Sequence, residues 1–270
     1  MTTALRRTAL AAALPVLATC ALAACGGTSS DRQTSRAMVR LGDRMLESGE
    51  LDSAAGFYRG AGERDPTDPE PRLRLATILA RQGDQDGATR GYLEVVAADP
   101  SNAEARVAAA AGLLRRGTPA AAQLAEETLA PVAGPGSRSA RALRLRGVAL
   151  DLLGRQGDAA EAYRRGIALA PADPDLRANL ALSLAVAGQA DAAVEEARRA
   201  VAVPGSGDAH RGNLVLVLAM AGRAAEAGVE ARTLPAGEAE NVLAQGRRAA
   251  AAPDAASRAV ILGVSRGRGA

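Results

Sequence analysis

Apolar residues recur along most of the chain with the period of an amphipathic helix, in stretches that end at glycine. Each stretch covers about fourteen residues, and the glycines that follow are spaced by 34, 34, 37, 34 and 34 residues. A glycine just past a helix end suits the left-handed conformation that terminates many helices. The pattern therefore predicts repeated pairs of helices joined by tight turns at Gly49, Gly83, Gly117, Gly154, Gly188 and Gly222.

Small side chains recur at two further positions of each repeat and predict close helix contacts. Five residues after each glycine comes an alanine: Ala54, Ala88, Ala122, Ala159, Ala193 and Ala227. Seven residues before each glycine stand Gly42, Ala76, Ala110, Gly147, Ala181 and Val215. Tyrosine occupies one equivalent position of the second helix in three repeats, where we expect its ring to fill the gap between neighbouring repeats: Tyr58, Tyr92 and Tyr163.

Proline and short polar residues mark the joints between repeats. Asp68-Pro69 and Asp173-Pro174 each offer an aspartate as helix N-cap and a proline for the first helical position. Asn102 follows Asp99-Pro100 and is expected to cap in the same way. These joints predict where each repeat begins.

The 34-residue period resembles the tetratricopeptide repeat between residues 35 and 234. The resemblance implies an all-α, right-handed superhelical solenoid of about six helix pairs, closed by a capping helix at 238–251. Residues 253–270 are expected to form a disordered tail. Glu126 stands at the tyrosine position of the third repeat, and Arg146 replaces the usual leucine before Gly147, so we expect a bend or register shift there. The predicted units are 35–68, 69–102, 103–139, 140–173, 174–207 and 208–234.

The first residues have the pattern of a secretory signal peptide. Arg6 and Arg7 precede an uncharged run to Ala24 that is too short and too rich in alanine for a spanning helix. Leu22-Ala23-Ala24-Cys25 resembles the bacterial lipobox, in which the cysteine is acylated and the chain is cleaved before it. The alternative is an ordinary signal peptide cut after Ala24, which would leave Cys25 as a free thiol.

Acylation at Cys25 would make the chain a lipid-anchored protein. We expect residues 1–24 to be the signal and residues 25–34 to be the acylated cysteine and a flexible tether. Two or more acyl chains hold a protein to a membrane almost permanently. Gly26 follows the cysteine in place of the aspartate that commonly retains lipoproteins in the inner membrane. This favours the periplasmic face of the outer membrane.

Composition argues against nucleic-acid binding and against catalysis. The pI is near 9.4, but without residues 1–24 the chain has 31 arginines against 30 acids, and these charges are interspersed. There is no lysine, and three Tyr and one Phe are too few for a base-stacking platform. The one histidine, His210, is expected to be exposed, and a general-base role for it is disfavoured. No Cys or His cluster predicts a metal site, and no cofactor is expected.

The concave face of units five and six is the candidate binding site for a protein partner. First helices line this face, and here they carry an apolar strip flanked by two amides. Such a strip suits an amphipathic helix or an extended segment, whose backbone the amides would satisfy. The alternative is that these residues are core between repeats. The candidates are Asn179, Leu182, Val186, Asn213, Leu216 and Met220.

Two stretches, residues 147–193 and 212–227, resemble the TadD-type repeat lipoprotein of the tight-adherence (Flp) pilus assembly machinery. The succession GVALDLLGR, then APADPDLRANLALSLAVAG, then NLVLVLAMAGRAAEA carries this resemblance through units four to six. It implies a non-enzymatic, outer-membrane scaffold that helps a pilus secretin to assemble or localise, in the manner of a pilotin. Alternatives are another six-repeat lipoprotein, such as a type IV pilus pilotin or a peptidoglycan-synthesis adaptor, and an enzyme hidden in the repeats.

Overall fold

The computed structural model describes residues 29–262, and this part of the chain forms fourteen α-helices and no strand. The predicted signal peptide and Cys25 lie outside the described residues. The helices are α1 (Ser29–Glu47), α2 (Leu51–Arg64), α3 (Glu70–Arg81), α4 (Gln85–Ala98), α5 (Ala103–Leu114), α6 (Pro119–Leu129), α7 (Ala140–Leu152), α8 (Gln156–Leu169), α9 (Pro174–Val186), α10 (Ala190–Ala202), α11 (Asp208–Met220), α12 (Ala224–Ala231), α13 (Ala236–Ala250) and α14 (Ala255–Leu262).

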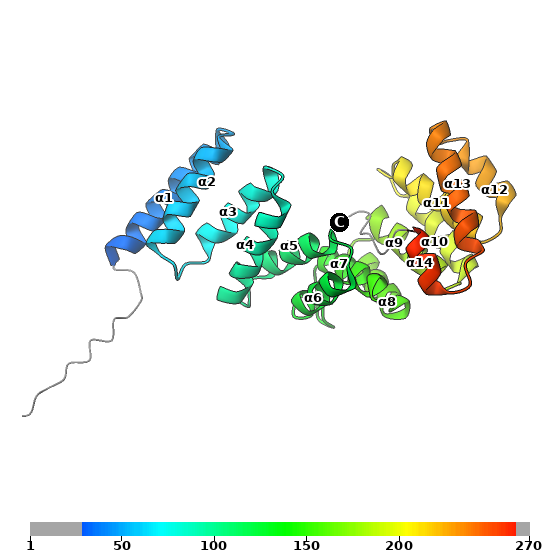
Figure 1. Cartoon of the computed structure of the whole chain (residues 1–270), viewed down its shortest axis with the longest axis horizontal. Coiled ribbons are helices and arrows are strands. Elements are labelled where there is room, and N and C mark those ends of the chain that lie inside the picture. The colour runs from blue at the N-terminus through cyan, green and yellow to red at the C-terminus, as the bar shows by residue number, and fades with distance from the viewer. Residues whose placement is uncertain (1–28, 263–270) are drawn as a thin grey trace, which may run out of the picture.

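Helices α1 to α12 form six consecutive pairs that stack along the long axis of the molecule (Figure 1). Each helix packs against its neighbours in the chain, and the first helices of successive units also contact one another in the series α5, α7, α9 and α11. The expectation of an all-α solenoid of helix pairs is therefore confirmed over the described residues. Because each pair touches mainly its neighbours, the core is a row of buried clusters along the stack.

The six glycines of the repeat end the first helices of the six pairs, as the sequence predicts. All six have positive φ angles, between 61° and 88°. At Gly188 the turn is closed by two backbone bonds, from Gly188 N to Ala185 O (3.1 Å) and from Gln189 N to Leu184 O (2.9 Å). This pair of bonds satisfies carbonyl groups at the helix end that would otherwise have no partner.

The small residues of the repeat lie where two helices of a pair approach each other. All six alanines that follow the glycines by five residues are at most 1% exposed. Gly42 and Gly147 lie against the rings of Tyr58 and Tyr163, and a β-carbon at Gly147 would overlap the Tyr163 ring. The small residues thus allow the two helices of a pair to pack closely. The rings of Tyr58 and Tyr163 fill the space beside Gly42 and Gly147.

The two departures from the repeat pattern, Glu126 in unit three and Arg146 in unit four, compensate each other. Glu126 on α6 and Arg146 on α7 form an ion pair at 3.1 Å, with the two side chains 15% and 25% exposed. Arg146 also donates to the carbonyl oxygen of Ala133 in the stretched joint that follows α6 (3.1 Å). A charged residue at the tyrosine position is tolerated here because its counter-ion comes from the next unit.

The flexible tether predicted for residues 25–34 is wrong over residues 29–34, because α1 begins at Ser29. Two polar side chains in the first turns of α1 contact α2, while most of the others are exposed. The buried Ser35 hydroxyl donates to the carbonyl oxygen of Ala61 (2.9 Å), and Asp31 lies 3.9 Å from Arg64. These contacts allow a polar segment to continue the first helix toward the N-terminus.

The disordered tail predicted for residues 253–270 is also wrong over residues 255–262, which form α14. Asp254 caps this helix by accepting from Ser257 N (2.7 Å). Leu262 at its end is buried in a cluster with Val186, Leu216 and Ala249. Arg258 donates to the carbonyl oxygen of Val186 at 2.7 Å. Helix α14 therefore returns to the concave side of α9.

Candidate partner-binding groove

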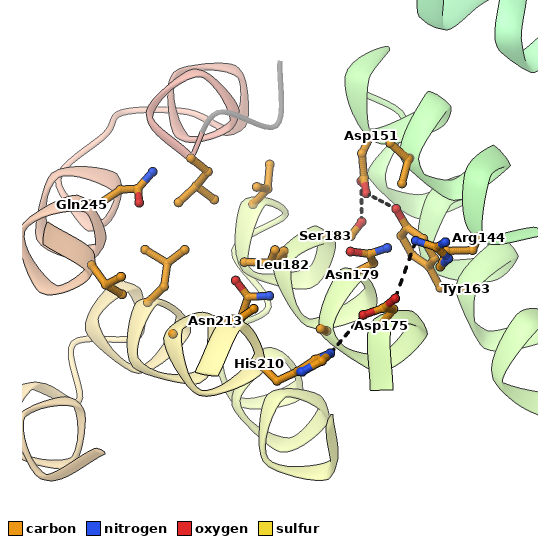
Figure 2. Close-up of a pocket in the computed structure, with 18 of the residues that line it drawn as sticks. Arg144, Asp151, Tyr163, Asp175, Asn179, Leu182, Ser183, His210, Asn213 and Gln245 are labelled. Atoms are coloured by element: carbon orange, nitrogen blue, oxygen red, sulfur yellow. Dashed lines mark hydrogen bonds and ion pairs between the residues drawn. The ribbon is translucent and has the colours of Figure 1, made fainter. Parts of the chain in front are cut away.

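A cavity of about 410 Å³ lies on the concave side of units four to six, between α7, α9 and α11 and the C-terminal helices α13 and α14 (Figure 2). Its lining combines an apolar floor with a polar wall on the α7 side. Five of the six groove residues expected from the sequence line it: Asn179, Leu182, Val186, Asn213 and Leu216. The sixth, Met220, lies beside a separate small hollow near Ala249 and Arg258.

The apolar floor is open at one end and covered at the other. Leu182 is half-buried and faces the cavity, whereas Val186 and Leu216 are only 1% and 5% exposed. Leu262 and Ala249 cover the latter two residues. Val186 and Leu216 are therefore largely core, which is the alternative that the sequence left open. Leu182, Asn179 and Asn213 remain half-buried at the cavity.

Helices α13 and α14 convert the end of the open groove into a pocket. Gly246 lets α13 cross α11 closely, because a β-carbon there would meet Ala219 and the carbonyl oxygen of Leu216. The Gln245 side chain donates to the carbonyl oxygen of Ile261 (2.8 Å), which ties α13 to the end of α14. The groove is thus closed at its C-terminal end by the chain itself.

Asp151 on α7 provides a buried carboxyl group in the polar wall. Its Oδ1 accepts a hydrogen bond from the Ser183 hydroxyl (2.7 Å), and its Oδ2 accepts one from the Tyr163 hydroxyl (2.9 Å). Asp151 is 8% exposed. Burial raises the pKa of its carboxyl group from 3.8 to about 7, against the opposing effect of the two hydrogen bonds. Burial of the Tyr163 side chain, together with the neighbouring Asp151 carboxylate, raises the pKa of the Tyr163 hydroxyl well above its ordinary value.

His210 is not exposed, contrary to the expectation from the sequence. Its side chain is 13% exposed and lies at the start of α11, where Nδ1 accepts a hydrogen bond from the backbone N–H of Gly207 (3.0 Å). Its Nε2 lies 3.0 Å from Asp175 Oδ1. Since Nδ1 is an acceptor, Nε2 carries the proton and donates it to Asp175. The ring therefore caps α11 and links it to α9.

Asp151 is the site residue that the sequence-based prediction missed, although a signal for it exists. It stands three residues before Gly154, at a position occupied in the other five units only by leucine or alanine. A carboxylate in an otherwise apolar register indicates either a buried polar network or a binding site. The serine that completes the network, Ser183, belongs to the next unit and offers no such local signal.

Within residues 29–262, no three or more His, Cys, Asp or Glu side chains are grouped so that they could hold a metal ion. None of the helices described there is long and apolar enough to cross a membrane.

Comparison with known families places the fold. Residues 45–114 match the sequence profile of the family described as Tetratricopeptide repeat. The fold is a tetratricopeptide-repeat solenoid. No curated protein sequence matches the chain.

Similar solved structures support the same fold assignment. PilW, described as a widely conserved type IV pilus biogenesis factor, has a TM-score of 0.64 at 20% identity, over 78% of this chain and 99% of PilW. PilF of Pseudomonas aeruginosa has a TM-score of 0.59 at 16% identity, over 76% of this chain and 92% of PilF. YrrB, described as a tetratricopeptide-repeat protein with an unusual peptide-binding site, has a TM-score of 0.57 at 16% identity, over 64% of this chain and 88% of YrrB.

Proposed function

We propose that this protein is a non-catalytic scaffold that binds a protein partner in the groove of units four to six and acts in pilus assembly. The observation that carries the proposal is the cavity on the concave face, with its apolar floor at Leu182 and its amides Asn179 and Asn213. An apolar strip supplies affinity for a bound segment, and side-chain amides satisfy the polar groups of its backbone.

The specific role we propose is that of a pilotin-like factor for the secretin of a tight-adherence (Flp) pilus. The TadD-like succession in residues 147–193 and 212–227 supports this assignment. The lipobox-like residues that end at Cys25 support attachment to the periplasmic face of the outer membrane, where a secretin assembles. The lipid anchor would hold the solenoid beside its partner and leave the groove accessible.

A type IV pilus pilotin is the second candidate function. The specific observation that favours it is the similarity in fold to PilW and to PilF, which extends over more than three quarters of this chain. Both candidates use the same groove and the same anchor, and they differ in the secretin that is bound.

The test replaces Leu182 by Glu in a strain that depends on this protein for piliation. A charge on the groove floor opposes burial of an apolar partner segment, so we expect SDS-resistant secretin multimers in the outer membrane to fall at least several-fold. Leu169→Glu is the matched control, because Leu169 is 46% exposed on α8 and does not line the cavity. Immunoblots and circular dichroism verify that both variants are present and helical.

The pilus system whose secretin is lost identifies the function. Loss of the Flp secretin supports the first proposal, and loss of a type IV pilus secretin supports the second. Normal multimers of both secretins with Leu182→Glu, in a strain where deletion of the gene abolishes them, would exclude the groove as the secretin-binding site.

A further inference from the structure

Asp151 is a buried acid that no cation neutralises within residues 29–262. Its two hydrogen-bond donors, Ser183 and Tyr163, are uncharged hydroxyl groups on α9 and α8. It forms no ion pair in the described part of the chain, and it lines the cavity. Figure 2 shows its carboxyl group at the α7 side of the cavity, next to the Ser183 hydroxyl.

This carboxyl group is costly to the free protein. A charge removed from water loses solvation free energy, and two hydroxyl donors return only part of it. The other five units place leucine or alanine at this position and pack without that cost. Groups that oppose stability in this way are found preferentially at binding sites, where a ligand supplies the missing interaction.

The cavity has the size and the lining for one long side chain with a charged end. Its volume of about 410 Å³ is at the lower end of the range for ligand pockets. Val148 and Leu182 give the lining an apolar surface in the same cavity as Asp151. Lysine and arginine carry an aliphatic stem that packs on such a surface while the charged end reaches a polar partner.

The charge of the lining also favours a cation. The described lining residues include three acids, Asp151, Asp175 and Glu238, against one arginine, Arg144. Arg144 lies 3.9 Å from Asp175, and His210 donates to that same carboxylate. Within residues 29–262, Asp151 by contrast accepts hydrogen bonds from neutral hydroxyl groups alone.

We propose that this pocket binds an arginine or lysine side chain of the partner polypeptide, with the stem against Leu182 and the cationic group at Asp151. The inference rests on the proposed function, because it assumes that the groove holds a polypeptide. It adds the chemistry of the residue that is recognised. A partner segment that fits would carry a basic residue between aliphatic ones.

The test measures binding of a capped pentapeptide, Ala-Leu-Arg-Leu-Ala, to the purified chain by NMR titration or calorimetry at pH 8. Matched peptides carry lysine or the uncharged isostere citrulline in place of arginine. We expect the arginine and lysine peptides to bind about tenfold more tightly than the citrulline peptide, since charge-assisted hydrogen bonds are the stronger ones. Asp151→Asn should abolish that difference, whereas Asp158→Asn, on the exposed face of α8, should preserve it.

A second measurement uses the unmodified protein, so that the proposal stays testable if Asp151→Asn folds poorly. Because the pKa of Asp151 is raised to about 7, affinity for the arginine peptide should increase from pH 6 to pH 8. The charged or titratable groups that share the pocket are Arg144 on α7, Tyr163 on α8, Asp175 on α9, His210 on α11 and Glu238 on α13. The citrulline peptide controls for pH effects that do not depend on the charge of the peptide, and the arginine peptide with His210→Gln controls for the charge of the histidine.

Three outcomes would overturn the inference. They are equal affinity for the arginine and citrulline peptides, a preference that survives Asp151→Asn, and no binding of any peptide at millimolar concentration. None of these would by itself overturn the proposed function, which is tested separately by secretin assembly with Leu182→Glu. If the arginine peptide binds no more tightly than the citrulline peptide and Leu182→Glu leaves secretin assembly unchanged, the groove is rejected as a binding site for the partner.

Discussion

Gly147 and Tyr163 show how one missing side chain sets the distance between two helices. The Tyr163 ring lies where a β-carbon of residue 147 would stand, and its hydroxyl reaches Asp151 on the same helix as Gly147. The small residue at this position of the repeat is therefore a steric requirement of the aromatic residue that follows it in the second helix.

Gly147→Ala tests this contact. The added methyl group must displace a buried ring, so we expect a loss of about 1–3 kcal/mol in the free energy of unfolding. Gly157→Ala in α8 is the control, because nothing lies within 4 Å of a β-carbon there. Alanine is the better helix former, so the control should match the parent or gain up to about 1 kcal/mol. Equal denaturation midpoints for both variants would contradict the close contact.

Asp151 makes stability depend on pH in a direction opposite to that of most acids. Its pKa is raised from 3.8 to about 7 in the folded chain, so the folded state holds a proton that the unfolded state releases. The contribution of protonated Asp151 to the free energy of unfolding is fully present below pH 4 and is lost as the pH rises through about 7. The shift corresponds to at most roughly 4 kcal/mol.

Asp151→Asn should remove this pH dependence. We expect the variant to match the parent below pH 4 and to melt several degrees higher at pH 8, because asparagine can bond both hydroxyls without carrying a charge. Thermal unfolding followed by circular dichroism at several pH values measures the difference, with Asp158→Asn as control. If the melting temperatures of the parent and of Asp151→Asn change with pH in parallel, Asp151 is ionised at neutral pH without a cost in stability.

At the scale of elements, the sequence predicts what depends on local pattern and misses what depends on distant contacts. Each helix pair follows from its own glycine, alanine and capping residues, as at Gly188 and Asp173. Helix α14 has only eight residues, and its order depends on Leu262 meeting Val186 and Leu216 far away in the chain. The same limit applies to the site, because Asp151 meets Ser183 only when units four and five are stacked.

Leu262→Glu tests whether α14 closes the groove. A charge in this buried cluster should detach α14 and leave the six helix pairs folded. Hydrogen exchange of residues 255–262 should then become fast, while the amides of α9 and α11 stay protected apart from those near Val186 and Leu216. Val260→Glu on the same helix is the control, since Val260 is 66% exposed. Unchanged protection of residues 255–262 in Leu262→Glu would contradict the contact.

At the scale of the whole molecule, the proposed anchor and the groove lie in different parts of the chain. The lipobox-like residues lie outside the described range and precede α1, whereas the cavity is lined by α7, α8, α9, α11, α13 and α14. Figure 1 places α1 and α13 at opposite ends of the solenoid. An acylated N-terminus would therefore hold one end of the stack at the membrane and present the groove at the other end.

Cys25→Ser tests the anchor. Serine cannot form the thioether, so we expect the unprocessed precursor to accumulate and labelling by radioactive palmitate to disappear. Cys20→Ser is the matched control, because it changes a cysteine in the same run that is not part of the lipobox-like residues. Palmitate incorporation that persists in Cys25→Ser would refute acylation at this residue.

The most direct test of the account is photo-crosslinking in piliated cells, with a photoreactive amino acid placed at the groove or on the opposite face. Ala209 is exposed at the rim of the cavity, and Glu161 is exposed on α8 away from it. We expect a crosslink to the pilus secretin from position 209, its loss when Leu182→Glu is added, and none from position 161. A secretin crosslink from position 161 but not from 209, or one from 209 that Leu182→Glu leaves unchanged, would contradict binding in the groove.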